Sequence, residues 1–316
     1  TREERALISV IVIGKNEGKR LTACLNSIST ALGRLSHEVI YVDSCSTDQS
    51  LQTARSLGAR CYLLAEKDTT AGLGRFVGAK EARGEYLLFL DGDMQLRSGF
   101  VEKALMAMAS HGYDGVCGIR KDLYMRGGEV VARNENYFNC TQERIVPEFG
   151  GALMITAEAL AACGGWSTDT VACEESELHA RLLAMGSRIA EIPVPMITHT
   201  DAVRDNRSPL HTVFSVRRLG EGQALACAFA SHHARDYIRH EREKLTFYAL
   251  DWLALFLLVL LSGWGFAAAM MLECMQLGWL LAKKRPRAFI SQKLFFFGLP
   301  LGLLTYRKRS RSYAAE

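Results

Sequence analysis

One stretch constrains the fold of this chain more than any other: an apolar run at residues 86–90 that ends at two aspartates separated by a glycine. Five consecutive apolar residues predict a strand buried on both faces, as in a parallel sheet. Such a strand reaches solvent at its carboxyl end, where open α/β sheets bind their ligands. Asp91 and Asp93 repel each other there, so sharing a divalent cation with phosphate oxygens and water is favourable. The simpler alternative is a turn, which Asp-Gly-Asp also suits.

The residues before this stretch alternate between apolar runs and helical spacing. Runs at 7–13, 38–42 and 60–64 predict three further strands, each followed by a helix or a loop that leads to one. A glycine-containing loop is expected at 70–74, before a helix over 75–82. Four strands alternating with helices within about 90 residues predict an α/β fold with a mostly parallel, doubly wound sheet and right-handed crossovers.

Beyond Asp93 the pattern is less regular. Helices are expected at about 98–110, 157–163 and 175–185, and strands at 115–119, 149–155 and 188–192. Residues 120–147 carry basic residues among aromatics, and they are expected to form antiparallel excursions or loops. We therefore expect one catalytic domain over residues 1–235 and a second region over residues 236–316.

Charge is unevenly distributed along the 316 residues. From Lys244 onward ten Lys/Arg face three Asp/Glu, so the net charge of +4 arises in this tail. A basic tail with long apolar blocks suits an anionic membrane surface better than nucleic acid.

The nine cysteines include no C-x-x-C pair, which predicts reduced thiols in a cytosolic compartment.

The tail itself has the pattern of membrane attachment. Residues 245–282 are almost entirely apolar, and basic residues flank both ends. One spanning helix needs about 20 apolar residues, so this length with like charge at both ends predicts a hairpin that turns at residues 263–265, with both flanks cytoplasmic. A block at 288–306, broken by Pro300, predicts an interfacial segment, with residues 289–297 at the level of the headgroups. The alternative is a buried, soluble helical domain.

Four motifs together resemble the inverting family 2 glycosyltransferases, which have the GT-A fold. They lie at residues 11–17, at 42–48, at 82–93 and at 174–182, and their order and spacing are more specific than any one of them. The resemblance extends from Ile8 to about His199. It implies a nucleotide-sugar donor, with a UDP-sugar expected, and Mg²⁺ or Mn²⁺ as the cofactor.

The resemblance places the nucleotide at the ends of the first two strands. It implies that base and ribose are bound near Ile13, Asn16, Glu17 and Asp43. The alternatives are that Asp43 caps the next helix and that Glu17 is a solvated side chain. Arg75 lies where family members hold a basic or small residue against the diphosphate, and a surface arginine is its alternative.

The metal site is also assigned by resemblance. Asp91 is expected to contact ribose or metal-bound water, and Asp93, across Gly92, is expected to bind the cation directly. The cation acts as a Lewis acid on the leaving diphosphate. His199 falls where several members place a further metal ligand or a diphosphate contact; a structural histidine is the alternative.

The catalytic base is expected at Glu174-Glu175, where the family usually shows Glu-Asp. A carboxylate here is implied to deprotonate the acceptor hydroxyl, and the spacing to Leu178 and Arg181 points to Glu175. Glu174 is the alternative, because glutamate is one methylene longer than aspartate. Both acids also favour a helix N-terminus in any protein.

These observations lead to one expected function and two alternatives. We expect a membrane-attached enzyme on the cytoplasmic face that transfers a single sugar, with inversion, to a lipid-linked or envelope polysaccharide acceptor. The chain has no Q-x-x-R-W motif, which argues against a processive synthase. The alternatives are a sugar nucleotidyltransferase, whose Gly-rich basic loop residues 14–18 match poorly, and a non-catalytic membrane scaffold. No nucleic-acid partner is expected.

Overall fold

The computed structural model describes residues 6–33, 35–65, 69–202, 216–260, 262–283, 298–308 and 313–315. They form two compact units. The first contains the described residues within 1–170, 174–205 and 307–316, and the second contains those within 171–173 and 206–306. The domain boundary expected at residue 235 stays a prediction.

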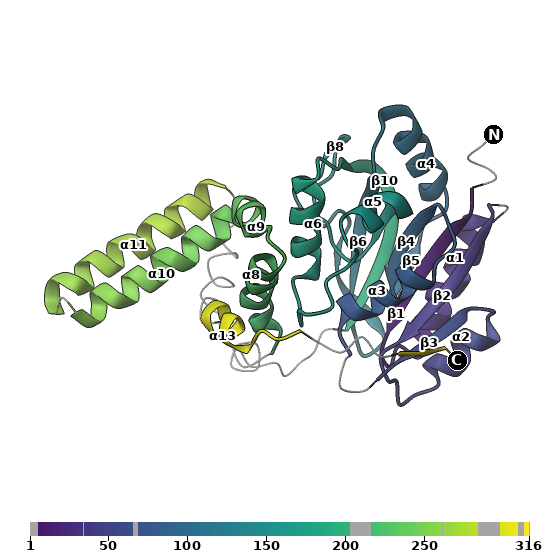
Figure 1. Ribbon diagram of the computed structural model, residues 1–316, viewed down its shortest axis with the longest axis horizontal. Helices are drawn as coiled ribbons and strands as arrows, with labels where there is room; N and C mark the ends of the chain where they lie inside the picture. The colour runs from purple at the N-terminus through teal and green to yellow at the C-terminus, as the bar shows by residue number, and fades with distance from the viewer. Residues whose placement is uncertain are drawn as a thin grey trace. The chain divides into compact units, whose positions relative to one another are not determined.

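The first unit is built on one mixed sheet whose amino-terminal part is parallel (Figure 1). β1 (Ile8–Gly14) pairs in parallel with β2 (His37–Asp43) and with β4 (Tyr86–Asp91), and β2 pairs in parallel with β3 (Arg60–Leu64). Almost every residue of β1 is buried, as its continuous apolar run predicts. The four predicted strands of this part are confirmed.

Helices α1 (Lys19–Leu32), α2 (Ser50–Ser56) and α3 (Ala71–Glu81) connect these strands. The loop predicted at 70–74 is wrong, because the Thr70 side chain caps α3 by accepting a hydrogen bond from the backbone N–H of Leu73. The earlier start adds a full turn to α3, which packs against β1 and β2.

The rest of the sheet combines parallel and antiparallel pairs. β9 (Leu153–Thr156) runs antiparallel to both β4 and β6 (Gly115–Arg126). β6 pairs in parallel with β10 (Ile189–Ala202) and antiparallel with β7 (Glu129–Asn134), which confirms antiparallel excursions in residues 120–147. β10 also pairs with β5 (Met94–Leu96).

β10 is much longer than the strand expected at 188–192. Its two prolines, Pro193 and Pro195, lie where the pairing with β6 shifts register, between Glu191 and Ile197. The strand continues through His199, which therefore lies within the sheet.

Further elements complete the first unit. They are β8 (Arg144–Ile145), α4 (Phe100–His111), α5 (Ala157–Ala162), α6 (Glu174–Ala184) and β11 (Tyr313–Ala315). β11 pairs antiparallel with β3, so the last described strand belongs to this sheet. That strand was not predicted from the residue pattern.

The second unit, as far as it is described, is helical. Its elements are η3 (Val216–Leu219), α8 (Gly220–Ala230), α9 (Ala234–His240), α10 (Arg242–Leu260), α11 (Ser262–Ala282) and α13 (Gly298–Thr305). α10 and α11 lie side by side as a hairpin (Figure 1). The turn predicted at 263–265 is wrong, since α10 ends at Leu260 and these residues belong to the first turn of α11, which begins at Ser262.

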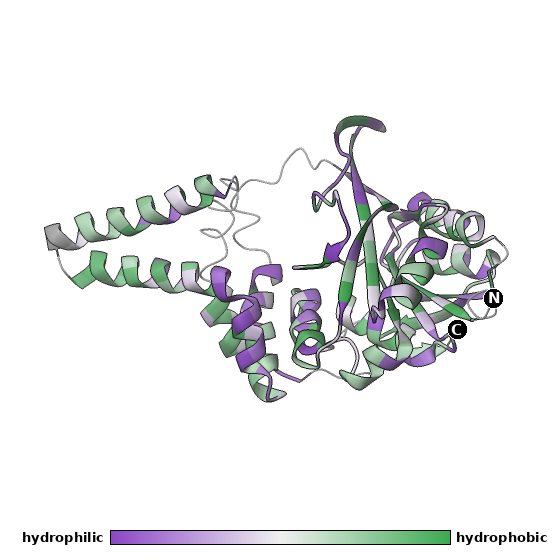
Figure 2. Cartoon of the chain, turned by 90° about the horizontal axis from the view of Figure 1, so that it is seen from above, coloured by the Kyte–Doolittle hydropathy of each residue, from purple (hydrophilic) through white to green (hydrophobic). Residues whose placement is uncertain are grey.

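The hairpin is polar inside at one place and apolar outside. Gln276 donates a 2.8 Å hydrogen bond to Asp251 between the helices, and both side chains are buried. Most residues of the two helices are hydrophobic (Figure 2). Large exposed apolar side chains include Phe256, Val259, Leu260, Phe266, Met271 and Trp279. Among the described helices, α11 is long and apolar enough over Gly265–Ala282 to cross a membrane.

The third predicted tail segment is described only in part. Residues 289–297, expected at headgroup level, lie outside the described residues. In the described part Pro300 lies in the first turn of α13, where no helical hydrogen bond is lost, and the break expected in the segment stays a prediction.

Candidate active site

The Asp91-Gly92-Asp93 link joins the end of β4 to β5, at the carboxyl edge of the parallel strands. The register places Asp91 beside Ile13 of β1, and the N–H of Gly92 donates a 2.8 Å hydrogen bond to the Ile13 carbonyl. A Cβ at position 92 would lie 2.8 Å from Cγ of Glu17, so glycine fits this close approach. The two aspartates therefore stand at the ligand-binding edge predicted from the sequence.

Arg75 is the centre of a buried ionic cluster on the Asp91 side. Its Nη2 lies 2.9 Å from Oδ1 of Asp91, and its Nη1 lies 2.7 Å from Oε1 of Glu174 and 3.4 Å from Oε1 of Glu175. The residue is only 2% exposed. Burial lowers the pKa of Arg75, but the carboxylates of Asp91, Glu175 and Glu174 outweigh it and raise that pKa. Arg75 is thus a permanent cation enclosed by acids.

Two further residues close the space around Arg75. The guanidinium lies over the ring of Trp166, 4.9 Å from its centroid. A Cβ at Gly151 would lie 2.3 Å from Nη2 of Arg75 and 2.9 Å from Oδ2 of Asp91. This packing differs from the surface position considered for Arg75, and its contact with a diphosphate stays a prediction.

Glu174 and Glu175, at the start of α6, have different surroundings. Glu174 is 5% exposed and is held by the close contact with Arg75. The side chain of Glu175 keeps 25% of its exposure and lies farther from that cation. Burial and the charge of Glu174 raise the pKa of Glu175 to about 7, although Arg75 opposes this. Glu175 therefore has the access and the proton affinity that a general base needs.

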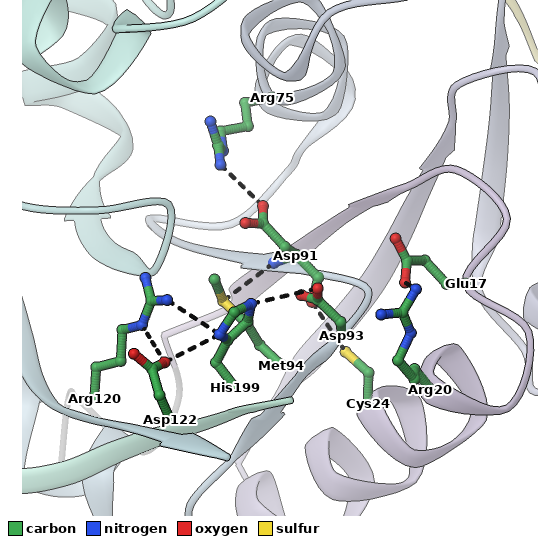
Figure 3. A network of polar contacts seen from close by, with 10 residues as sticks. All are labelled: Glu17, Arg20, Cys24, Arg75, Asp91, Asp93, Met94, Arg120, Asp122 and His199. Atoms are coloured by element: carbon green, nitrogen blue, oxygen red, sulfur yellow. Dashed lines mark hydrogen bonds and ion pairs between the residues drawn. The ribbon is translucent and has the colours of Figure 1, made fainter. Parts of the chain in front are cut away.

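The Asp93 side of the link holds a different network (Figure 3). Oδ2 of Asp93 lies 3.4 Å from Nε2 of His199, and Nδ1 of His199 lies 3.0 Å from Oδ1 of Asp122. Arg120 contacts both partners: its Nε donates to Oδ1 of Asp122 at 2.8 Å, and its Nη2 lies 3.0 Å from Nδ1 of His199. The pairing of β10 with β6 brings His199 beside Asp122.

The charges of Asp93 and His199 stabilise each other. Burial raises the pKa of Asp93, but the hydrogen bond and charge of His199 outweigh burial, so the pKa of Asp93 is lowered below its usual value. Burial lowers the pKa of His199, and Asp93 reverses this, so the pKa of His199 is raised. The Oδ1 atom of Asp93 is buried without a hydrogen-bond partner.

The fit of a divalent cation differs between the predicted ligands. Among the described residues no three His, Cys, Asp or Glu side chains already converge on one point as a complete metal site. Asp91 faces Arg75, whereas Asp93 faces His199 (Figure 3). The unpartnered oxygen of Asp93 and the adjacent imidazole suit a cation whose other ligands are phosphate oxygens and water. Two of the three predicted ligands are thus brought together.

The loops after β1 and β2 are joined through polar contacts. Oδ1 of Asn16 accepts a 2.7 Å hydrogen bond from the N–H of Thr47, and the N–H of Asn16 donates to Ser46. Asp43 is buried and accepts from the hydroxyl of Tyr41 at 2.9 Å and from the N–H of Ser46 at 2.6 Å. Asp43 therefore braces its own loop, and its predicted contact with the nucleotide stays a prediction.

Glu17 connects these loops to the metal side. It forms a 2.8 Å ion pair with Arg20, and its side chain is 15% exposed. Burial and the nearby charge of Asp93 raise the pKa of Glu17, although Arg20 opposes them. Glu17 is therefore a partly buried carboxyl group rather than the solvated one considered as the alternative.

Sequence reasoning missed Arg120, Asp122, Gly151 and Trp166. Arg120 and Asp122 lie in the stretch expected to be irregular, and only the pairing of β6 with β10 brings them to His199. Gly150-Gly151 was visible as a glycine pair at the start of the strand predicted at 149–155. That pair was the one available signal for a close approach near the site.

Comparison with known proteins gives a family match over residues 9–167, half of the chain, to the model described as glycosyl transferase family 2. This segment includes Arg75 and Asp91-Gly92-Asp93. Glu174, Glu175 and His199 lie beyond it.

Curated relatives match parts of the chain. Glycosyltransferase AglE of Haloferax volcanii is 27% identical over 137 residues, which cover 42% of this chain and 45% of that protein. The dolichol-phosphate mannosyltransferase of Pyrococcus furiosus is 31% identical over 126 residues, 39% of this chain and 35% of that protein. The chain therefore spans less than half the length of these relatives.

Solved structures match nearly the whole chain at low identity. PcManGT, a mannosyltransferase from Pyrobaculum calidifontis in complex with GDP-Man and Mn²⁺, has a TM-score of 0.61 and 18% identity, covering 95% of this chain and 88% of that one. TarS 1–349 of Staphylococcus aureus with UDP-GlcNAc has a TM-score of 0.53 and 17% identity, covering 94% and 90%. These likenesses establish the GT-A fold.

Proposed function

Because the chain belongs to glycosyl transferase family 2 and is a glycosyltransferase, we propose that it transfers a single sugar with inversion from a nucleotide-sugar donor to a lipid-linked or polysaccharide acceptor. The observation that supports this most is that the site contains two distinct acids. Glu175 is a half-buried carboxyl group whose pKa is raised to about 7, and Asp93 has a carboxylate oxygen without a hydrogen-bond partner. One group suits proton removal and the other suits cation binding.

The proposed chemistry follows from these two positions. Glu175 takes the proton of the acceptor hydroxyl while the acceptor oxygen forms a bond to the anomeric carbon. The bond from that carbon to the diphosphate oxygen breaks on the opposite side, and the nucleoside diphosphate leaves. Asp93 and His199 would hold a Mg²⁺ or Mn²⁺ ion, which would supply positive charge to stabilise the leaving group. Arg75 keeps Glu174 and Asp91 in place, which leaves Glu175 as the accessible acid of the pair.

The donor and acceptor classes are supported by the relatives. The two structural neighbours are complexes with GDP-Man and UDP-GlcNAc, so both nucleotide types belong in a donor screen, with a UDP-sugar expected first. A relative named dolichol-phosphate mannosyltransferase acts on a lipid phosphate, and one named poly(ribitol-phosphate) beta-N-acetylglucosaminyltransferase acts on a polymer. The match to a glycosyltransferase family argues against both alternatives, a nucleotidyltransferase and a non-catalytic scaffold.

A donor screen tests the proposed reaction. Purified full-length protein is incubated with UDP- and GDP-sugars with and without Mn²⁺, and release of the nucleoside diphosphate is measured. We expect Mn²⁺-dependent release with at least one donor, and the anomeric configuration of the product, read by NMR, should be inverted. A product that retains the donor configuration would contradict the role given to Glu175.

We also propose that the hairpin of α10 and α11 attaches the enzyme to the cytoplasmic face of a membrane without crossing it. Its outward side chains are apolar, and its polar pair, Asp251 and Gln276, is buried between the helices. Near the open end of the hairpin Lys283 pairs with Glu243, where charged groups can remain in water. Both chain ends are then cytoplasmic.

Topology is tested on the full chain. A reporter fused after Glu316 should give a cytoplasmic signal, and a Ser262→Cys variant should resist a thiol reagent that cannot cross the membrane. The wild-type protein is the control, because it already carries Cys274 on α11. A periplasmic signal from the fusion, or labelling at residue 262 from outside, would indicate a spanning arrangement.

A further inference from the structure

We infer that Asp122 is a positioning residue for the metal site: it accepts the hydrogen bond of Nδ1–H in His199, so that the lone pair of Nε2 faces the cation beside Asp93. The inference rests on the proposed metal-dependent function and adds a residue that the comparisons do not assign. It is supported by contacts between β6 and β10. Asp122 lies inside the segment that matches the family, and His199 lies beyond it.

The fixed position of Asp122 is the first part of the argument. Asp122 is 1% exposed, so water does not compete for its carboxylate. Its Oδ1 lies 3.0 Å from Nδ1 of His199 and accepts a 2.8 Å hydrogen bond from Nε of Arg120. The guanidinium compensates the buried charge and holds the carboxylate in one orientation.

The chemistry of imidazole makes this contact decisive. A neutral imidazole carries one N–H, and the partner of one ring nitrogen determines whether the other can bind a metal. If Nδ1–H donates to Asp122, Nε2 has a free lone pair. Nε2 is the atom that lies 3.4 Å from Asp93. The cation would then be bound by this nitrogen and by the unpartnered oxygen of Asp93.

Arg120 offers Nδ1 the opposite partner. Its Nη2 lies 3.0 Å from Nδ1 and can only donate, which suits a ring with Nε2–H directed at Asp93. The two neighbours therefore favour different tautomers of His199. With Arg120 as the partner of Nδ1, His199 donates Nε2–H to Asp93. With Asp122 as the partner of Nδ1, Nε2 carries no hydrogen and can bind a cation.

The same strand offers a matched control. Glu191 on β10 is also fully buried and accepts from Arg144 through Nε at 2.9 Å and Nη2 at 2.7 Å. It is a buried carboxylate held by an arginine, like Asp122. In the pairing with β6, Glu191 lies beside Cys117, whereas His199 lies beside Asp122. Glu191→Gln therefore removes a comparable charge without touching the proposed cation site.

Mn²⁺ binding tests the inference without an activity assay. Free Mn²⁺ is measured by electron paramagnetic resonance in the presence of UDP or GDP for wild type, Asp122→Asn, Glu191→Gln, His199→Ala and Asp93→Ala. We expect Asp122→Asn to weaken Mn²⁺ binding by about 10- to 100-fold, the usual effect of losing a partner of a metal-bound histidine. Glu191→Gln should bind as wild type does. Combining Asp122→Asn with His199→Ala should cost no more than His199→Ala alone.

The outcomes separate this inference from the proposed function. If Asp93→Ala loses Mn²⁺ and Asp122→Asn does not, Asp122 has no positioning role and only this inference fails. If Asp93→Ala also binds Mn²⁺ as wild type does, the proposed metal site itself is wrong.

A second measurement determines the tautomer of His199 in the wild-type protein. In protein labelled with ¹⁵N-histidine, the ring nitrogen shifts report the tautomer, and His199→Gln identifies the signals of His199. With Mg²⁺ and the nucleotide present, we expect Nδ1 to be protonated and Nε2 to be free of hydrogen. Protonation at Nε2 under these conditions would overturn the inference.

Discussion

The two aspartates of the Asp91-Gly92-Asp93 link lie two residues apart but have opposite surroundings. On one side Asp91, Glu174 and Glu175 surround a buried guanidinium, that of Arg75. On the other side Asp93 faces His199 and keeps one buried oxygen without a partner. The first side already contains its cation, and the second offers an unpartnered carboxylate oxygen to one.

This difference separates two tasks that acidic residues perform in one site. Arg75 compensates Glu174 and Asp91 permanently, so the first side holds acids in position, while burial and the charge of Glu174 raise the pKa of Glu175. The second side has a weaker, imidazole-based partner, which an external cation can join. In the proposed reaction the arginine side would position the general base, and the metal side would hold the cation that stabilises the leaving group.

The largest expected effect comes from the metal side. Asp93→Ala should abolish the Mn²⁺-dependent part of nucleotide-sugar binding, because it removes the carboxylate with the unpartnered oxygen. Calorimetry with and without Mn²⁺ measures this, with Asp114→Ala as a control, since Asp114 accepts from the Arg188 N–H at the opposite edge of the sheet. Equal donor affinity in wild type and Asp93→Ala would remove the contrast between the two sides.

The arginine side should respond in stability. Arg75→Met leaves buried carboxylates without their cation, and we expect a loss of about 3–5 kcal/mol in the free energy of unfolding. Denaturant titration checks this. Arg20→Met, which removes a half-exposed partner of Glu17, is the matched control and should cost about 1 kcal/mol or less. Similar losses in both variants would show that Arg75 is not the anchor of its cluster.

The base assignment sharpens the comparison within the arginine side. Glu175→Gln should keep donor binding and lower turnover by about 100-fold or more, the usual range for losing a positioned general base. Glu174→Gln should lower turnover less, since Glu174 is held by Arg75. If the losses come in the opposite order, Glu174 is the base.

A smaller effect is expected from pH. The pKa of Glu175 is raised to about 7, and a base acts in its deprotonated form. The kcat/KM value should therefore rise with pH and level off above about 7, falling roughly tenfold per pH unit on the acid side. In Glu175→Gln the residual activity should lack this limb. A wild-type profile that is flat between pH 5 and 8 would argue against the assignment.

The features of the site that depend on residues adjacent in the chain were predicted from the sequence. A continuous apolar run ending in Asp91-Gly92-Asp93 is enough to place two carboxylates at a parallel strand end, and the four amino-terminal strands are confirmed. The acids at residues 174 and 175 likewise begin a helix, α6. These features follow from residues adjacent in the chain.

The remaining features depend on contacts between distant residues. Asp122 and His199 are 77 residues apart and meet only through β6 and β10, whose pairing passes through an irregular register. The burial of Arg75 requires Gly151 and Trp166 from a later part of the chain, and no periodicity near Arg75 indicates this. The turn of the hairpin was misplaced at residues 263–265, because glycines in the first turn of a helix resemble a turn in sequence.

The most direct test of the contrast between the two aspartates is the position of the cation. Crystals of the full chain grown with Mn²⁺ and UDP or GDP, measured at the manganese absorption edge, would locate the ion by its anomalous scattering. We predict a peak within about 2.5 Å of the Asp93 carboxylate and of Nε2 of His199, with Asp91 still paired to Arg75. A peak bound by Asp91, with Asp93 still facing His199 alone, would contradict the account.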